Sequence, residues 1–138
     1  MSMILKLLTG VLIASGVCGC SGEKQSALTG KVVYKDGSEM MFHSDSIELQ
    51  SVSNPQHFAY GQLSEQGEFE VESLISGEIV RGAPAGKYRV RFIVSDDDIV
   101  HKKDLLSKID KRFLDYETSG WNAEVPGSNV ILELAGPR

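Results

Sequence analysis

The chain has 138 residues, 41% of them hydrophobic, and a net charge of −5. A chain of this length forms one domain, which buries about two-thirds of the surface of its unfolded state and needs no disulfide. The acidic balance argues against a partner nucleic acid, which requires clustered lysine and arginine, and against a polybasic contact with anionic lipid.

The first residues of the chain predict an export signal. Lys6 is the only charge before Glu23, and an apolar run follows it from Leu7 to Val17. This run is too short for a membrane-spanning helix, which needs about 20 residues. A positive start, a short apolar core and small residues after it are typical of a secretory signal peptide, here residues 1–19.

The signal ends in Val17-Cys18-Gly19-Cys20-Ser21, which resembles the bacterial lipobox. The resemblance implies cleavage before Cys20 and lipidation of that residue by a diacylglyceryl group and usually a further acyl chain such as palmitate. Two or three acyl chains hold a protein on a membrane without a spanning helix. The alternative is an ordinary cleaved signal that leaves Cys20 free or paired. Because Ser21 stands where inner-membrane lipoproteins often carry Asp, the expected location is the outer membrane or the periplasmic face of the cell envelope.

Residues 20–27 are small and polar and predict a lipidated tether, with the domain at residues 28–138. Within the domain, short segments of alternating apolar and polar residues are separated by Gly, Pro and Asp turns, as in a β-sandwich. The expected strands are 28–35, 46–50, 57–63, 68–72, 87–94, 121–125 and 130–134. Strand register in 38–46 stays open, because Met40 and Met41 are adjacent and fit no period.

The chain is organised around residues 82–94. Pro84 restricts its own backbone, and glycines lie two residues away on either side, at Gly82 and Gly86. The segment after Gly86 is the longest alternating strand. Its inward face carries Tyr88, Val90, Phe92 and Val94.

Two charged faces offer a possible strand pairing. Glu68, Glu70 and Glu72 lie on one strand, and the outer face of 87–94 carries Lys87, Arg89 and Arg91. Opposite charges facing each other across paired strands stabilise a sheet by about 0.2–1 kcal/mol per pair. Solvated faces on unpaired strands explain the same pattern equally well.

Residues 99–118 interrupt the strand pattern. Leu105, Leu106, Ile109 and Phe113 have helical spacing and predict a short helix within 102–113. The whole pattern therefore predicts an all-β sandwich of seven to eight strands with one helix or loop excursion.

Four segments together resemble transthyretin-like domains, also described as carboxypeptidase-regulatory-like, of small lipoproteins abundant in planctomycete-type bacteria. The segments are Gly30–Tyr34, Gly67–Val71, Gly82–Val90 and Lys111–Gly120. The resemblance implies a Greek-key sandwich tethered to a membrane, without established chemistry. Residues 38–46 depart from the family, which has a compact turn and a clean strand there.

No metal site, cofactor site or catalytic centre is expected. Asp96-Asp97-Asp98 lacks the ligand spacing of calcium loops and indicates an acidic turn that caps a strand. His43, His57 and His101 are dispersed and are expected to be surface or strand residues. No G-x-S-x-G motif marks a nucleophile.

Lys31, Glu70 and Asn129 resemble the set that forms an isopeptide bond in collagen-adhesin B-type domains. Because Lys31 lies on the opposite face from Val32 and Tyr34, we expect an exposed lysine instead.

These observations favour a non-enzymatic structural or protein-interaction module, held on the membrane through Cys20, with another envelope protein or a glycan as partner. The alternative is a carbohydrate- or peptide-binding module that uses the 99–118 excursion with Trp121 and Tyr116. Trp121 shares a face with Ala123 and Val125, which favours a core position for its ring. A transthyretin-fold hydrolase ranks third, because its histidine, arginine and serine motifs have no counterpart here.

Overall fold

The computed structural model describes residues 24–138, so the predicted signal peptide and the predicted lipidation site, Cys20, lie outside the described residues. The described chain forms ten strands, one α-helix and one 3-10 helix. In chain order these are β1 (Gln25–Ser26), β2 (Leu28–Tyr34), β3 (Ser46–Ser51), β4 (Phe58–Gln62), β5 (Glu68–Ile75), β6 (Glu78–Arg81), β7 (Ala83–Pro84), β8 (Gly86–Ile93), α1 (Ile99–Lys108), η1 (Lys111–Leu114), β9 (Trp121–Val125) and β10 (Gly127–Leu134).

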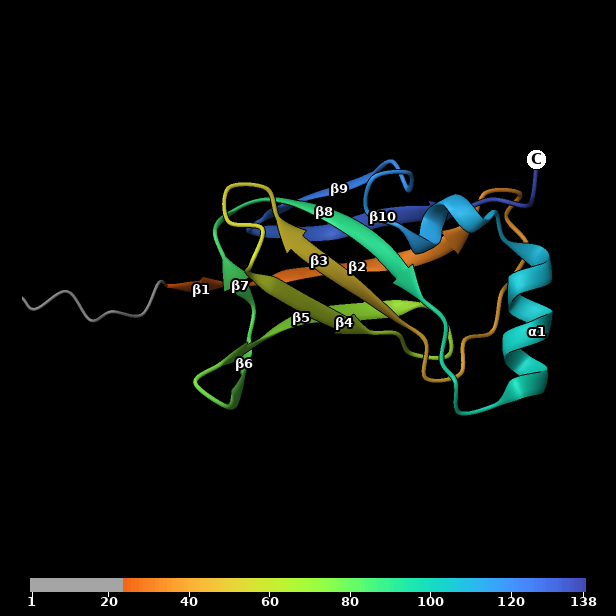
Figure 1. Ribbon diagram of the computed structural model, residues 1–138, viewed down its shortest axis with the longest axis horizontal. Helices are drawn as coiled ribbons and strands as arrows, with labels where there is room; N and C mark the ends of the chain where they lie inside the picture. Colours follow the sequence, from red (N-terminus) through yellow and green to blue (C-terminus); the bar gives the residue numbers. More distant parts are fainter. Residues whose placement is uncertain (1–23) are drawn as a thin grey trace, which may run out of the picture.

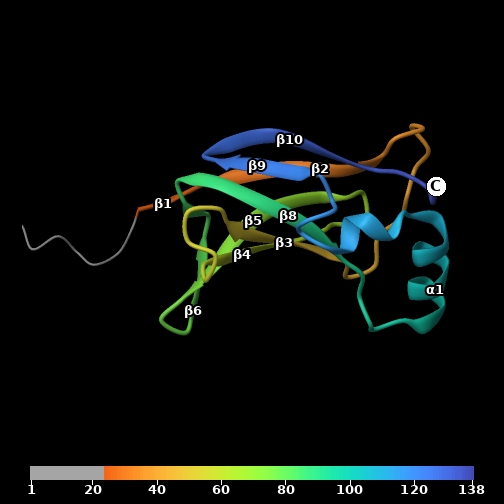
Figure 2. The same cartoon turned by 45° about the horizontal axis from the view of Figure 1, so that its top comes forward.

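Eight of the strands belong to one sheet that curls around the core (Figures 1 and 2). Seven follow the order β10-β2-β5-β4-β3-β8-β9, and β6 pairs with β5. The pairing of β2 with β10 is parallel, and the others are antiparallel. The ends of the sheet meet where the indole Nε1 of Trp121 in β9 donates to the carbonyl oxygen of Glu133 in β10, at 3.1 Å. The fold is therefore all-β, a sandwich close to a barrel.

The core lies inside this curl and is rich in aromatic side chains. Phe92 in β8 lies 5.9 Å from Phe42 and 6.5 Å from Trp121 between ring centroids, and Phe113 of η1 lies 5.1 Å from Trp121. All four rings are buried. Aromatic contacts at such distances add to the stabilisation from buried area alone.

Alternation predicted the inward faces of several strands correctly. Tyr88, Val90 and Phe92 of β8 are buried, as are Ile47 and Leu49 of β3. In β4 the small residues Ala59 and Gly61 point inward, while Phe58 and Tyr60 lie on the outer face. A side chain at Gly61 would meet Ile47, because a Cβ there would lie 3.0 Å from Ile47 Cγ1. A larger residue at Gly61 would therefore require Ile47 to shift.

The segment 38–46, whose register the sequence left open, forms no strand before Ser46, and residues 36–45 are an irregular loop. Phe42 is buried in the core and Met41 is 57% exposed. Phe42 and Asp45, three residues apart, are the buried residues of the loop, and this spacing does not follow the period of a strand.

The proposed pairing of the glutamate strand with the lysine and arginine strand is wrong. β5 pairs with β2, β4 and β6, whereas β8 pairs with β3 and β9. Arg91 instead faces Glu48 across β3 and β8, and their side chains form an ion pair at 2.9 Å. Alternation identifies the faces of strands but not their neighbours.

The excursion at 99–118 contains a helix, but not over the predicted range. Helix α1 begins at Ile99, three residues before the predicted segment, and ends at Lys108; Phe113 lies in the separate turn η1. Leu105, Ile109 and Phe113 are all buried. The helical spacing arose from two consecutive short elements that cover the same end of the core.

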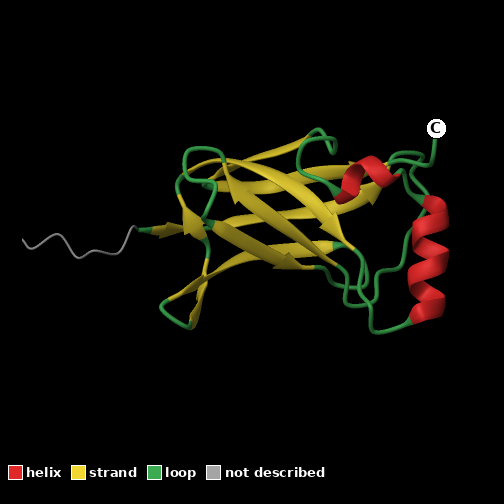
Figure 3. Ribbon diagram, in the orientation of Figure 1, coloured by secondary structure: helices red, strands yellow, loops and turns green. Residues whose placement is uncertain are grey.

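The two ends of the sandwich differ in character (Figure 3). One end carries α1 and the loops beside it. The other carries the β5–β6 hairpin and the short β1–β7 pair. In that pair Ser26 lies opposite Ala83, so the first strand falls within residues 20–27, which the sequence predicted as a tether. Among residues 24–138, no helix has the length and apolar character needed to cross a bilayer.

Candidate functional site

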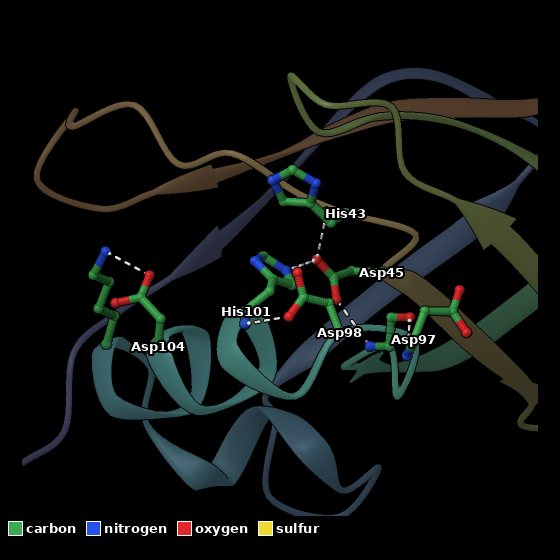
Figure 4. Close-up of polar contacts among 8 residues, drawn as sticks. His43, Asp45, Asp97, Asp98, His101 and Asp104 are labelled. Atoms are coloured by element: carbon green, nitrogen blue, oxygen red, sulfur yellow. Dashed lines mark hydrogen bonds and ion pairs between the residues drawn. The ribbon is translucent and has the colours of Figure 1, made fainter.

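A buried carboxylate, that of Asp45, lies at the α1 end (Figure 4). Asp45 is 0% exposed. Its Oδ2 accepts from His101 Nε2 at 2.9 Å and from the backbone N–H of His43 at 3.1 Å, and its Oδ1 accepts from the backbone N–H of Ser95 at 2.9 Å. One carboxylate thus joins the 36–45 loop, the end of β8 and helix α1.

Helix α1 positions the side chain of His101 beside this carboxylate. Asp98 is the N-cap residue, and its Oδ1 accepts from the backbone N–H groups of Val100 at 2.9 Å and His101 at 3.2 Å. Such a cap satisfies amides that have no partner inside the helix and fixes where the helix begins. His101 then lies in the first turn, 11% exposed, facing Asp45. The acidic turn caps a helix rather than the strand that the sequence indicated.

The histidine–aspartate pair has a structural role in this arrangement. An ionised carboxylate only accepts, so Nε2 of His101 carries the proton of the shared bond. The His43 ring lies edge-on to the His101 ring, 4.6 Å away between centroids. No group of three or more His, Cys, Asp or Glu side chains in residues 24–138 is arranged to hold a metal ion. The carboxylate accepts from one donor of its own loop, His43, and from two donors of other segments, Ser95 and His101.

His101 therefore corrects the expectation of a surface or strand histidine, whereas His43 is exposed and His57 is half-buried. A signal for the pair does exist in the sequence. Asp45, Ile47 and Leu49 occupy alternate positions, and Ile47 and Leu49 point inward. A carboxylate in phase with an inward face needs buried donors.

A pocket of about 490 Å³ lies between the 36–45 loop and α1. Its wall includes Tyr34, Met40, His101 and Lys108. The hydroxyl of Tyr34 donates to the carbonyl oxygen of Lys108 at 2.7 Å, near the end of the helix. This pocket is one concave part of the α1 end and borders the 99–118 excursion that the sequence named for a binding module.

A second polar feature, the Tyr116 cluster, lies on the outer face of the sheet and comprises Glu48, Phe58, Tyr60, Arg91 and Tyr116. The Tyr116 hydroxyl donates to Oε1 of Glu48, and the Arg91 guanidinium lies 5.2 Å from the centre of the Tyr116 ring. Phe58 lies 6.4 Å from Tyr116, and Tyr60 pairs with Glu48 across β3 and β4. Tyr60 is 43% exposed. Rings and charges together form a mixed surface of the kind that can stack on a ligand.

The Tyr116 cluster gives an expected pH dependence. Partial burial, and then the hydrogen bond and negative charge of Glu48, raise the pKa of the Tyr116 phenol above 10.0. Below pH 10 both folded and unfolded chains keep this proton, and above it the unfolded chain loses the proton first, so the free energy of unfolding falls. Urea unfolding from about pH 9 to about pH 11 should show a smaller loss in Tyr116→Phe than in the native protein. Equal losses would contradict this assignment.

Trp121 belongs to the core and not to this surface. Its side chain is 7% exposed and lies between Phe92 and Phe113. Its N–H is satisfied by Glu133. A ring enclosed in this way cannot stack on a ligand without opening the core, so of the two residues named for ligand contact only Tyr116 reaches the surface.

Lys31, Glu70 and Asn129 line one groove on the outer face of β2, β5 and β10. Lys31 is half-buried, and Glu70 and Asn129 are exposed. No hydrogen bond or ion pair joins any two of these described residues. The topology thus gathers the three, but on a solvated face and without the buried carboxylate of the domains they resemble.

Comparison with known proteins finds no matching family model, no matching curated protein and no matching solved structure.

Proposed function

We propose that the protein is a lipid-anchored β-sandwich of the bacterial cell envelope that acts as a structural or protein-interaction module rather than as an enzyme. The observation that carries the proposal is where the fold begins. Strand β1 starts five residues after Cys20, at the end of the sandwich opposite α1 (Figure 1). An anchor at Cys20 would hold that end towards the membrane and direct the α1 end towards a partner.

The proposed fold type is a transthyretin-like Greek-key sandwich. Support comes from where the four resembling segments fall: in β2, at the start of β5, across β7 and β8, and across η1 to the start of β9. The proposed location is the outer membrane or its periplasmic face, because Ser21 follows Cys20.

A substitution at Cys20 tests the anchor. When the native chain is expressed in a bacterium that processes lipoproteins, we expect an alkyne analogue of palmitate to label it and the protein to sediment with membranes. Cys20→Ser should abolish both, because the thiol that forms the thioether is gone. The measurements are in-gel fluorescence of the label and the distribution between membrane and soluble fractions.

Cys18→Ser is the matched control. Cys18 lies inside the proposed signal peptide, so this variant should be labelled and sediment as the native protein does. An unlabelled native protein, or a Cys20→Ser variant that keeps its label, would overturn the anchor.

The Tyr116 cluster favours a second candidate, a carbohydrate- or peptide-binding module. Tyr60 and Tyr116 present partly exposed rings beside the charges of Glu48 and Arg91. Sugars stack on such rings and accept hydrogen bonds from flanking polar groups. A glycan array separates the candidates, since only a binding module would give signals that Tyr60→Ala removes.

A further inference from the structure

The β5–β6 hairpin exposes two large apolar side chains next to each other. Leu74 and Ile79 are paired across the hairpin and are 62% and 73% exposed. The preceding outward positions of β5 are Glu68, Glu70 and Glu72, so Leu74 breaks an otherwise charged face at the point where the strand leaves the sandwich. The turn itself is tight, with positive φ at Ser76 and Gly77, as in two-residue hairpins.

The hairpin projects from the end of the sandwich at which the chain enters the fold (Figures 1 and 2). Directly after β6, a Cβ at Gly82 would lie 2.3 Å from the carbonyl oxygen of Ser26 in β1, so the base of the hairpin touches the entering chain. Gln25 follows Cys20 by five positions, and five extended residues span at most about 18 Å. A lipid group on Cys20 therefore keeps the hairpin close to the bilayer surface.

We propose that Leu74 and Ile79 insert into the lipid surface to which Cys20 is attached. This inference rests on the proposed lipid anchor. The next pair on the same face of the hairpin, two rungs away, is Glu72 with Arg81, which places charged groups at headgroup level when the apolar rung enters the acyl boundary. Arginine can extend its charged end towards the headgroups while its stem lies along apolar surface.

Insertion would set the orientation of the domain. A single acyl anchor at one end of a domain permits many orientations, whereas a second contact at the hairpin limits rotation about the anchor. The exposed side chains of Ile99 and Val100 on α1 lie at the opposite end and would face away from the membrane (Figure 1). They provide a matched position for comparison.

The experiment uses the lipidated full chain with one added cysteine, because acylation of Cys20 and removal of Cys18 leave the mature protein without a free thiol. Leu74→Cys and, as the control, Val100→Cys are labelled with the polarity-sensitive dye NBD. Each is reconstituted into phosphatidylcholine–phosphatidylglycerol vesicles that contain headgroup-nitroxide lipid. The measurements are the emission maximum and the quenching by the nitroxide.

We expect the dye at residue 74 to emit at shorter wavelength on vesicles than in detergent-free buffer, and to be quenched at least about twofold more than the dye at residue 100, as for groups within about 5–10 Å of the headgroup boundary. Vesicle-bound protein with equal quenching at both positions would overturn the hairpin contact and leave the anchor standing. Protein that is not retained on vesicles would overturn the anchor, and the hairpin contact with it.

Discussion

Asp45→Ala is expected to lower the free energy of unfolding by about 3 kcal/mol or more, because it leaves three donors around a fully buried position without an acceptor, at about 1–3 kcal/mol for each unsatisfied group. The substitution leaves the backbone N–H groups of His43 and Ser95 and the Nε2–H of His101 without their acceptor. Because the free energy of unfolding of a natural domain is about 5–15 kcal/mol, a loss of this size removes a large part of the stability. Urea denaturation followed by tryptophan fluorescence measures it through Trp121.

Two further variants separate the carboxylate from its partners. Asp45→Asn keeps the shape but turns an N–H₂ group towards donors, so it should lose about 1–3 kcal/mol. His101→Ala removes one of three donors and leaves two N–H groups on the carboxylate, so its loss should be smaller than that of Asp45→Ala. If Asp45 and His101 act together, the double variant should fall short of the sum of the single effects.

We also expect Asp45→Ala to loosen the structure only near residue 45. Hydrogen exchange should accelerate at the Ser95 and His43 amides and in α1, while the β3–β8 ladder keeps its protection. An Asp45→Ala variant that unfolds within about 0.5 kcal/mol of the native protein would show that the carboxylate is not the tie between these segments.

The faces of the strands could be predicted from the sequence, but their neighbours could not. Tyr88, Val90 and Phe92 alternate so regularly that their burial follows from period two alone. The partner of a charged strand depends instead on how the chain crosses the sheet. Glu48 neutralises Arg91 because β3 lies beside β8, a long-range fact that no local pattern records.

The β5–β6 hairpin escaped prediction for a related reason. Ser76-Gly77 is a turn signal, but Leu74 and Ile79 on either side of it are apolar and exposed. Predictions from hydrophobicity assume that large apolar residues point inward. A residue that violates this rule at a turn produces no periodicity and is overlooked. Exposed apolar residues of this kind often mark a surface that binds a partner.

Of the candidate site, single residues could be predicted and their contacts could not. Tyr116 was singled out from its neighbourhood in the sequence, but its contact with Glu48 joins positions 68 residues apart. His101 was considered alone, without the buried Asp45 that gives it a role. Spacing motifs detect ligands on one element, whereas this pair comes from a loop and a helix that meet only in the folded chain.

The second large effect on stability is expected at Gly82, in the glycine-rich turn before β8. Gly82→Ala is expected to destabilise the fold by about 3 kcal/mol or more, because two costs add. The backbone at Gly82 has φ +86°, which an alanine resists, and a Cβ there would lie 2.3 Å from the carbonyl oxygen of Ser26. The clash is with backbone atoms of Ser26, so it can be relieved only by moving β1 away from β7.

Gly77→Ala is the matched control for strain without a clash. Gly77 has φ +81°, and a Cβ there would meet no atom within 4 Å. Its cost should therefore be the conformational cost alone, about 1–2 kcal/mol. Urea denaturation of both variants gives the difference, which measures the close approach between the turn and the entering chain.

The two variants should also differ in where they loosen the structure. In Gly82→Ala the amides of Gln25 and Ser26 should exchange rapidly while those in the centre of β8 stay protected, because β1 is the element that must move. In Gly77→Ala the β1 amides should keep their protection. Equal destabilisation by both variants, with β1 protected in each, would mean that the chain does not enter the fold against this turn, and would remove the structural basis for placing the hairpin near the anchor.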